Sequence, residues 1–274
     1  RVVRVQRHVR VVALTSSPAR VAALRAQGVT PVVGNLDAPA SLQRLAGWAT
    51  RVLHLAPPPL QGSTDPRTLA LTRMLMRRSA PRSVVYGSTS GVYGDCAGAW
   101  VDESRKVNPA TPRAQRRVDA EARVRHLGRL RSSGVQVSVL RIPGIYAPDR
   151  EGGTPRERLL RGTPVLARED DVFTNHIHAD DLARACQLAL WRGIPQRVVN
   201  VNDDSQMLMG DYFDVAAGLY GLAKPPRISR AQAQTELPAM QLSFMSESRR
   251  MVNTRMKHEL RLQLRYAKVE DGLR

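Results

Sequence analysis

The sequence is poor in aromatic residues, in lysine and in cysteine. Phe, Trp and Tyr make up 4% of the 274 residues, which leaves few rings for stacking on nucleic-acid bases. The two cysteines, Cys96 and Cys186, lie far apart and form no metal or redox motif, so we expect a reducing, cytoplasmic setting. No apolar run approaches the roughly 18 residues that a membrane-spanning helix needs, and the N-terminus has no apolar secretory segment. We therefore expect no membrane association.

The net charge of +18 comes almost entirely from arginine, because the chain has only four lysines. A basic surface can neutralise phosphates, so a basic nucleic-acid-binding protein is one alternative function. The arginines are spread along the chain instead of forming one tract, which is typical of a solvated surface. This dispersal and the scarcity of aromatic rings disfavour nucleic acid as the partner.

Short β-branched runs alternate with helical stretches through most of the chain. The pattern predicts strands at residues 8–14, 30–34, 51–56, 82–87, 135–141, 173–177 and 197–201. It predicts helices at residues 19–27, 40–46, 65–78, 112–131 and 180–192. This alternation is typical of βαβ units, so the expected fold class is α/β with a doubly wound, Rossmann-like parallel sheet.

Small or hydroxyl-bearing residues follow five of the expected strands. In doubly wound sheets, ligands bind outside the carboxyl ends of the strands. Each of these segments alone is typical of an ordinary βα turn, but the five together predict a site for a polar ligand. The segments are Thr15-Ser16-Ser17, Asn35, Ala56-Pro57, Ser88-Thr89-Ser90 and Pro143-Gly144.

Four segments in order resemble one known family. They are His54-Leu55-Ala56, the stretch from Tyr86 to Gly94 (YGSTSGVYG), the stretch from Arg141 to Pro148 (RIPGIYAP), and the stretch from Ile177 to Ala183 (IHADDLA). Each is weak alone. Together, over roughly residues 8–204, their order and spacing resemble the extended short-chain dehydrogenase/reductase superfamily, and within it the bacterial NAD(P)-dependent epimerase/dehydratase-like oxidoreductases. The motifs indicate the superfamily and not a substrate.

The resemblance implies a division by function. Residues 1–147, with 172–204 returning to them, would form a dinucleotide-binding domain, and residues 148–171 and 205–274 a small substrate-binding lobe. The family opens with a strand and a G-x-x-G-x-x-G loop that holds the pyrophosphate, and this chain has no such loop. Residues 1–7 are similar to the end of the helix that follows that loop. We therefore expect the first strand and the Gly-rich loop to be missing from this chain, because upstream residues are missing from the sequence.

The resemblance implies a dinucleotide coenzyme. A site for NAD places an acidic residue after the strand that ends near Leu14, but this chain has hydroxyls and Arg20 there, which suit a 2′-phosphate. We therefore expect NADP in preference to NAD, although a capped turn with a solvated Arg20 would give the same sequence. The expected coenzyme-binding residues are Thr15, Ser16, Arg20, Asn35, Leu36, Leu55, Ala56, Pro57, Ser88, Arg117, Pro143, Gly144 and Ile145.

The family's catalytic Tyr-x-x-x-Lys pair falls on Arg113 and Arg117. No tyrosine lies between Tyr93 and Tyr146, so a small shift in alignment does not restore the pair. Arginine stays protonated and cannot give a proton, whereas Arg117 can still hold a ribose or a phosphate. Thr89 falls where the family has its substrate-orienting Ser or Thr. The expected catalytic residues are Thr89, Tyr93, Arg113 and Arg117, and the expected substrate-binding residues are Ser90, Tyr146, Asn175 and His176.

Two of these assignments have structural alternatives. Tyr93 and Tyr146 are the phenols nearest to the expected site, and each is also typical of a structural tyrosine beside a turn.

The segment His176-Ile177-His178-Ala179-Asp180-Asp181 contains metal-ligating side chains. No further cluster supplies the remaining ligands, and acidic residues also cap helices, so we expect no metal.

The expected function is that of a NAD(P)-dependent oxidoreductase or epimerase acting on a small polar substrate, such as a nucleotide sugar. Because the usual Tyr and Lys are absent, an inactive NADP-binding sensor or scaffold on the same fold is the alternative. The family also implies a possible homodimer through the helices at residues 65–78 and 112–131.

Overall fold

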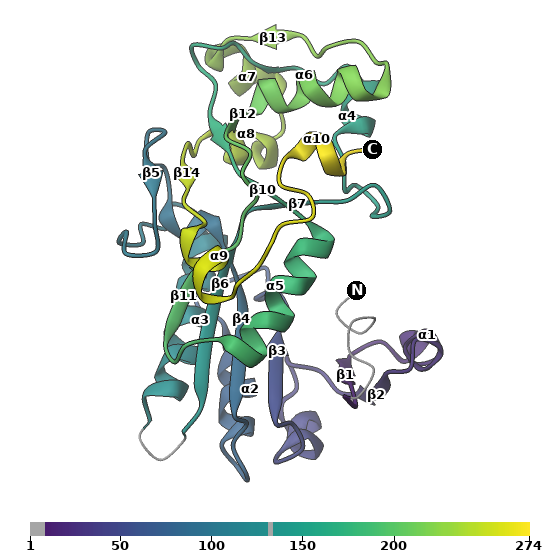
Figure 1. Ribbon diagram of the computed structural model, residues 1–274, viewed down its shortest axis with the longest axis vertical. Coiled ribbons are helices and arrows are strands. Elements are labelled where there is room, and N and C mark those ends of the chain that lie inside the picture. Colours follow the sequence, from purple (N-terminus) through teal and green to yellow (C-terminus); the bar gives the residue numbers. More distant parts are fainter. Residues whose placement is uncertain (1–8, 131–133) are drawn as a thin grey trace. The chain divides into compact units, whose positions relative to one another are not determined.

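The computed structural model describes residues 9–130 and 134–274, so the expectation for residues 1–7 lies outside the described residues. The chain divides into two compact units, which are described separately (Figure 1). Unit 1 comprises the described residues of Arg1–Ser88, Thr111–Leu140 and Ala183–Val198, and unit 2 comprises Thr89–Ala110, Arg141–Leu182 and Val199–Arg274. The division by function expected from the sequence stays a prediction.

Unit 1 is built on a four-stranded sheet with the order β11-β6-β4-β3. Strand β3 pairs with β4 in parallel, with Leu53 opposite Val85. The strands are β3 (Arg51–His54), β4 (Ser83–Thr89), β6 (Gln136–Ile142) and β11 (Arg197–Asn200). All four were expected from their β-branched runs, with ends shifted by at most two residues.

Helices cover both faces of this sheet. They are α2 (Pro66–Leu75), α3 (Pro112–Arg129) and α5 (Ala179–Arg192) (Figure 1). Side chains of α2 and α3 pack in one core with Val84 and Tyr86 of β4. Residues of β4 that alternate with these point the opposite way, and Ser83 bonds the carbonyl oxygen of Leu190 in α5. A parallel sheet with helices on both faces confirms the expected α/β class.

Helices α2 and α3 begin within one residue of where the sequence predicts. Asp65 caps α2 by accepting hydrogen bonds from the amides of Arg67 and Thr68, and Pro66 occupies the first helical position. Thr111 and Pro112 start α3 in the same way. The expected end of α3 at Arg131 lies outside the described residues.

A separate parallel pair precedes the four-stranded sheet in the chain. Strand β1 (Val12–Thr15) pairs with β2 (Thr30–Val33), and a 3-10 turn (Pro18–Arg20) and α1 (Val21–Ala26) connect them. A seven-residue 3-10 helix (Pro39–Leu45) follows β2. Leu14 of β1 and Leu36, which follows β2, pack against the core of unit 1.

Unit 2 is built from short strand pairs and helices around a second core. Strands β7 (Gly144–Tyr146) and β10 (His176–His178) pair in parallel, with His176 opposite Gly144. The other pairs are β9 (Phe173–Thr174) with β12 (Met207–Leu208), β8 (Val165–Leu166) with β13 (Arg227–Ile228), and β5 (Trp100–Val101) with β14 (Arg250–Met251). The helices are α4 (Arg156–Leu160), α6 (Met209–Tyr220), α7 (Arg230–Glu236), α8 (Ala239–Met245), α9 (Thr254–Glu259) and α10 (Val269–Gly272). Tyr146, Leu166, Phe213 and Leu273 lie in this second core.

The strand expected at residues 173–177 is interrupted. It forms β9 and β10, and Asn175 separates them. In the described part of the chain, no helix combines the length and the apolar character needed to cross a bilayer.

Candidate functional site

The turn that follows β4 carries Thr89, the residue expected to orient a substrate. A 3-10 turn (Ser90–Tyr93) follows Thr89, and the Thr89 hydroxyl accepts a 3.3 Å hydrogen bond from the Gly91 amide. Gly94 closes the turn at φ +67°, where a Cβ would overlap the carbonyl oxygen of Asn108. The turn therefore fixes the Thr89 hydroxyl and depends on glycine at position 94.

The two phenols nominated from the sequence are both buried in unit 2. Tyr93 is 1% exposed and its hydroxyl donates a 2.7 Å hydrogen bond to Oδ1 of Asn200. Tyr146 is 2% exposed and its hydroxyl lies 3.4 Å from the Lys268 carbonyl oxygen. Burial raises the pKa of Tyr146. This environment favours structural roles for both phenols.

Arg117 of α3 is bound to the carboxyl end of β4. Its Nη1 donates hydrogen bonds of 2.8 Å to the Gly87 carbonyl oxygen and 3.0 Å to the Tyr86 hydroxyl. Burial raises the pKa of Tyr86 to about 12, so this phenol stays neutral beside the guanidinium. Arg113 lies one turn earlier on α3, on the same side of the helix, and its side chain is exposed.

Further buried polar contacts of unit 1 brace the ends of β3 and β4. The Thr68 hydroxyl donates to Asp65 at 2.6 Å, so it must accept its 2.8 Å hydrogen bond from Nε2 of His54. Burial lowers the pKa of His54 to about 4, so the imidazole is neutral at pH 7. The Ser88 hydroxyl donates to the Glu121 carboxylate at 2.5 Å. These hydrogen bonds fix the ends of β3 and β4, where several of the expected coenzyme-binding residues lie.

The expected coenzyme residues after β1, β2 and β3 lie at or near the surface of unit 1. Ser16, Arg20, Asn35, Leu55 and Pro57 are exposed, while Thr15, Leu36 and Ala56 are half-buried. Arg67 connects two of these strand ends: it forms two hydrogen bonds of 2.7 Å with the Asp37 carboxylate and one of 3.1 Å with the Pro57 carbonyl oxygen. Neither Arg67 nor Asp37 was expected from the sequence, because the pairing joins residues 30 positions apart.

The expected substrate residues of β7 and β10 are tied to the C-terminal part of unit 2. Asn175 donates a 2.9 Å hydrogen bond to the Arg249 carbonyl oxygen and accepts one of 2.7 Å from the Met251 amide. His176 stacks on Tyr212 with ring centroids 4.1 Å apart, and burial lowers its pKa to about 4. The imidazole is therefore neutral at pH 7. Gly144 pairs with His176, Ile145 follows it in β7, and Pro143 immediately precedes that strand.

Sequence reasoning missed a pair of charged residues beside the Thr89 turn. Arg249 is 8% exposed, and its Nη1 lies 2.9 Å from the Glu247 carboxylate and 2.8 Å from the Gly94 carbonyl oxygen. Its Nη2 lies 3.4 Å from the Ser90 hydroxyl. A basic tail would ordinarily be solvated, so only the folded chain reveals that Arg249 is buried against this turn.

In the segment from His176 to Asp181, the side chains of His178 and Asp181 accept hydrogen bonds from backbone amides. The His178 ring accepts a hydrogen bond from the Asp180 amide, and Asp181 accepts hydrogen bonds from the amides of Arg265 and Tyr266. Within residues 9–130 and 134–274, no cluster of three or more His, Cys, Asp or Glu side chains has an arrangement suited to a metal ion.

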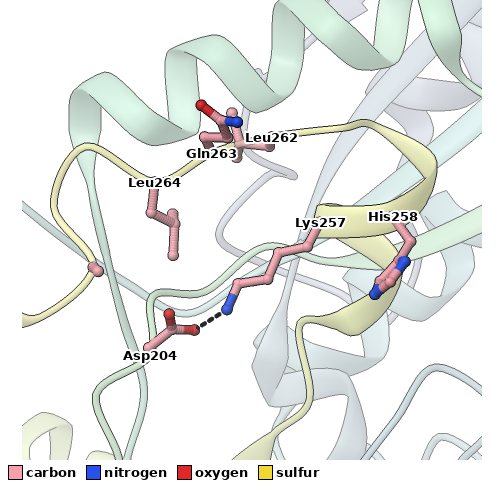
Figure 2. Close-up of a pocket in the computed structure, with 7 residues that line it drawn as sticks. Asp204, Lys257, His258, Leu262, Gln263 and Leu264 are labelled. Atoms are coloured by element: carbon pink, nitrogen blue, oxygen red, sulfur yellow. Dashed lines mark hydrogen bonds and ion pairs between the residues drawn. The ribbon is translucent and has the colours of Figure 1, made fainter.

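Two open hollows of unit 2 lie apart from the expected site residues. One, of about 400 Å³, is lined by Asp204, Lys257, His258, Leu262, Gln263, Leu264 and Ala267. In Figure 2 the Lys257 side chain crosses this hollow to Asp204, with Nζ 2.6 Å from the carboxylate. The other, of about 420 Å³, is bordered by Asp95, Phe173, Arg230 and Ser248, among others. The lining of the first hollow contains none of the residues nominated from the sequence.

The structure thus brings the nominated residues together in two groups. In unit 1, Ser88 bonds Glu121 and Arg117 bonds the Gly87 carbonyl oxygen, so both lie at the end of β4. Arg67 links the Pro57 carbonyl oxygen to the turn after β2. In unit 2, Ser90 lies beside Arg249, whose carbonyl oxygen holds Asn175. Tyr146 and His176 contact each other edge to face with ring centroids 6.4 Å apart.

Comparisons with known proteins bear on the family and the fold of this chain. The family model described as "NAD dependent epimerase/dehydratase family" matches residues 3–202. A functionally unknown conserved protein from Silicibacter pomeroyi DSS is 31% identical, with a TM-score of 0.79 over 96% of this chain and 88% of that one.

Two further proteins have names that refer to nucleotide sugars. The "Putative UDP-glucose 4-epimerase" of Methanocaldococcus jannaschii is 24% identical over 151 residues, which are 52% of this chain but only 48% of that protein. The matched region therefore spans about half the length of this relative. The structure of MoeE5 in complex with UDP-glucose and NAD has a TM-score of 0.73 at 19% identity, covering 97% of this chain and 96% of that one. At that identity the likeness concerns the fold alone.

Proposed function

Since this chain belongs to the NAD dependent epimerase/dehydratase family, we propose that it is an NAD(P)-dependent oxidoreductase or epimerase acting on a small polar substrate of the nucleotide-sugar class. The observation that carries the proposal is the Thr89 hydroxyl, fixed by the Gly91 amide at the carboxyl end of β4. In a doubly wound sheet this is the edge where ligands bind. UDP-glucose is the sugar nucleotide named with the MoeE5 neighbour, which supports this substrate class.

The residues of unit 1 fit the adenosine end of a dinucleotide. Ser16, Arg20 and Asn35 are exposed at the ends of β1 and β2 and provide hydroxyl, guanidinium and amide groups. A guanidinium binds a phosphate through charge-assisted hydrogen bonds, so Arg20 favours the 2′-phosphate of NADP over the bare ribose of NAD. When bound, the nicotinamide of the coenzyme supplies hydride transfer.

Arg113 and Arg117 replace the tyrosine and lysine of the usual catalytic pair. We assign Arg117 to the nicotinamide end of the coenzyme, because its Nη1 is held by Gly87 and Tyr86 at the carboxyl end of β4. Arg113 would bind an anionic group of the substrate. The two helices α2 and α3, packed together in unit 1, are the proposed surface of a homodimer.

One observation favours a second candidate, a coenzyme-binding sensor without turnover. Tyr93 and Tyr146 are buried and hydrogen-bonded, so neither presents an open phenol that could replace the missing tyrosine. A sensor would keep the coenzyme site and lack the chemistry.

Coenzyme reduction separates the two candidates. The protein is mixed with NADP⁺ and UDP-glucose, and nicotinamide absorbance is followed through a single turnover. An enzyme reduces NADP⁺ or interconverts the sugar, whereas a sensor binds NADPH and leaves the sugar unchanged. Binding of neither coenzyme would overturn both candidates.

A further inference from the structure

The ends of β1 and β2 lie side by side at one edge of their parallel pair. Thr15 is opposite Val33, and the Gly34 amide donates a 3.0 Å hydrogen bond to the Thr15 carbonyl oxygen. Ser16 follows β1 and Asn35 follows Gly34 at the end of β2, and both residues are exposed. A ligand that is held at the end of β1 can therefore also contact the end of β2.

The turn that begins at Asn35 has a fixed conformation. The Ser41 hydroxyl accepts a 2.9 Å hydrogen bond from the Asn35 amide and lies 2.7 Å from the Ala38 carbonyl oxygen. The side-chain oxygen of Asn35, Oδ1, accepts a 2.9 Å hydrogen bond from the Asp37 amide. A backbone amide needs an acceptor, so this contact fixes which branch of the carboxamide is the oxygen. The other branch, the NH₂ group of an exposed residue, is the donor that a ligand can bond.

Arg67 binds the carboxylate of the same turn. Its Nε and Nη2 donate hydrogen bonds of 2.7 Å to the two oxygens of Asp37. These hydrogen bonds lower the pKa of Asp37, so the carboxylate is ionised and paired at neutral pH. Nη1 of Arg67 donates to the Pro57 carbonyl oxygen and ties the turn to the end of β3. The acid of this turn is thus bound to the arginine, while Asn35 presents a hydrogen-bond donor.

The spacing of the two strands matches the geometry of a nucleotide. Neighbouring strands lie about 4.8 Å apart. In a ribose, the carbon that carries the base is bonded directly to the carbon that carries the 2′-phosphate. A coenzyme whose 2′-phosphate is bound by Ser16 and Arg20 after β1 therefore places its base over the end of β2, at Asn35.

We propose that Asn35 determines which base the protein accepts: its Nδ2 donates a hydrogen bond to a ring nitrogen of the coenzyme's purine, and the turn does not select the amino group of adenine. The proposal rests on the proposed coenzyme binding and adds the recognition of the base to it. Adenine offers the acceptors N3 and N7 and one amino donor. Hypoxanthine keeps both acceptors and has an oxygen in place of the amino group, so a donor from Asn35 serves either base.

Substitutions at position 35 test the donor. Aspartate keeps an oxygen for the Asp37 amide but places a second acceptor where the NH₂ group was, whereas alanine removes the side-chain contact alone. We expect Asn35→Ala to weaken NADPH binding about fivefold, which is the effect of one hydrogen bond, and Asn35→Asp to weaken it about tenfold or more. Fluorescence titration measures the dissociation constants.

The matched control is Ala38→Asp, which adds the same negative charge to the same exposed turn. It should change the NADPH dissociation constant less than about threefold. Both aspartate variants should melt within a few degrees of the wild type, because positions 35 and 38 are exposed.

A second titration tests the amino group. It uses the reduced nicotinamide hypoxanthine dinucleotide phosphate, which carries hypoxanthine in place of adenine. The wild type should bind this coenzyme within about threefold of NADPH.

The outcomes separate the inference from the proposed function. If Asn35→Asp binds NADPH as tightly as Ala38→Asp does, the inference is overturned and the proposed coenzyme binding stands. The same conclusion follows if the wild type binds the hypoxanthine coenzyme more than about threefold more weakly than NADPH. If the wild type binds neither NADPH nor NADH, the proposed function fails, and the role of Asn35 fails with it.

Discussion

The Arg117 guanidinium of α3 lies 3.0 Å from the hydroxyl of Tyr86 in β4. The same Nη1 also bonds the Gly87 carbonyl oxygen, so Arg117 joins α3 to the carboxyl end of β4. A lysine at this position would have a single ammonium group for both tasks. Arginine can hold β4 through one nitrogen and leave the other for a ligand.

Arg117→Met should destabilise the protein by about 1–3 kcal/mol, because it removes hydrogen bonds from a charged donor and leaves the Gly87 carbonyl oxygen without that partner. Tyr86→Phe removes the phenol alone and should cost about 1 kcal/mol. Urea unfolding of the two variants measures both losses in the free energy of unfolding. Equal stability of Arg117→Met and the wild type would contradict the anchoring role.

Arg20→Ala should weaken NADPH binding about tenfold while changing NADH binding little, since one charge-assisted contact to a 2′-phosphate contributes about 1.4 kcal/mol. Arg25→Ala, on α1 and also exposed, is the matched control. Fluorescence titration gives the ratio of the NADPH and NADH dissociation constants for each variant. An equal loss for NADPH and NADH would assign Arg20 to a site other than the 2′-phosphate.

Asp203→Asn should stabilise the protein above pH 7. Burial raises the pKa of Asp203 to about 8, well above its ordinary value of 3.8, so the folded state favours the protonated carboxyl. The free energy of unfolding therefore falls as the pH rises from about 4 to about 8. The total loss is about 1.4 kcal/mol for each unit by which folding raises the pKa. Asparagine resembles the protonated acid and can still accept the Ser205 amide hydrogen bond.

Thermal melting across pH measures this effect. The difference between Asp203→Asn and the wild type should be small at pH 4 and largest at pH 9, and Glu151→Gln should show no such trend. A wild-type protein that becomes more stable between pH 5 and pH 8 through Asp203 would contradict the raised pKa.

Gly94→Ala should destabilise the protein by about 2 kcal/mol or more, whereas Gly91→Ala should be close to neutral. Gly94 has φ +67° and its Cβ would overlap the Asn108 carbonyl oxygen, but the Gly91 Cβ would meet only ordinary contacts. Unfolding midpoints of the two variants test the contrast directly. Similar midpoints would mean that the turn adapts to a side chain at position 94.

Local sequence signals predicted much of the fold. Asp65-Pro66 and Thr111-Pro112 start α2 and α3 because an N-cap side chain and a proline act within one turn. The break between β9 and β10 was not predictable in this way, because Asn175 bonds Arg249 and Met251, which are more than 70 residues away. The same holds for Glu247 and Arg249, where charge predicts exposure and long-range packing buries the arginine.

The central claim is that this chain binds a nicotinamide coenzyme, NADP in preference to NAD, through the ends of its strands and Arg117. Fluorescence titration of NADPH and NADH against the wild type, Arg20→Ala and Arg117→Ala tests it most directly. The account predicts saturable NADPH binding that is tighter than NADH binding and is weakened by both substitutions. Absence of saturable binding of either coenzyme would contradict the account.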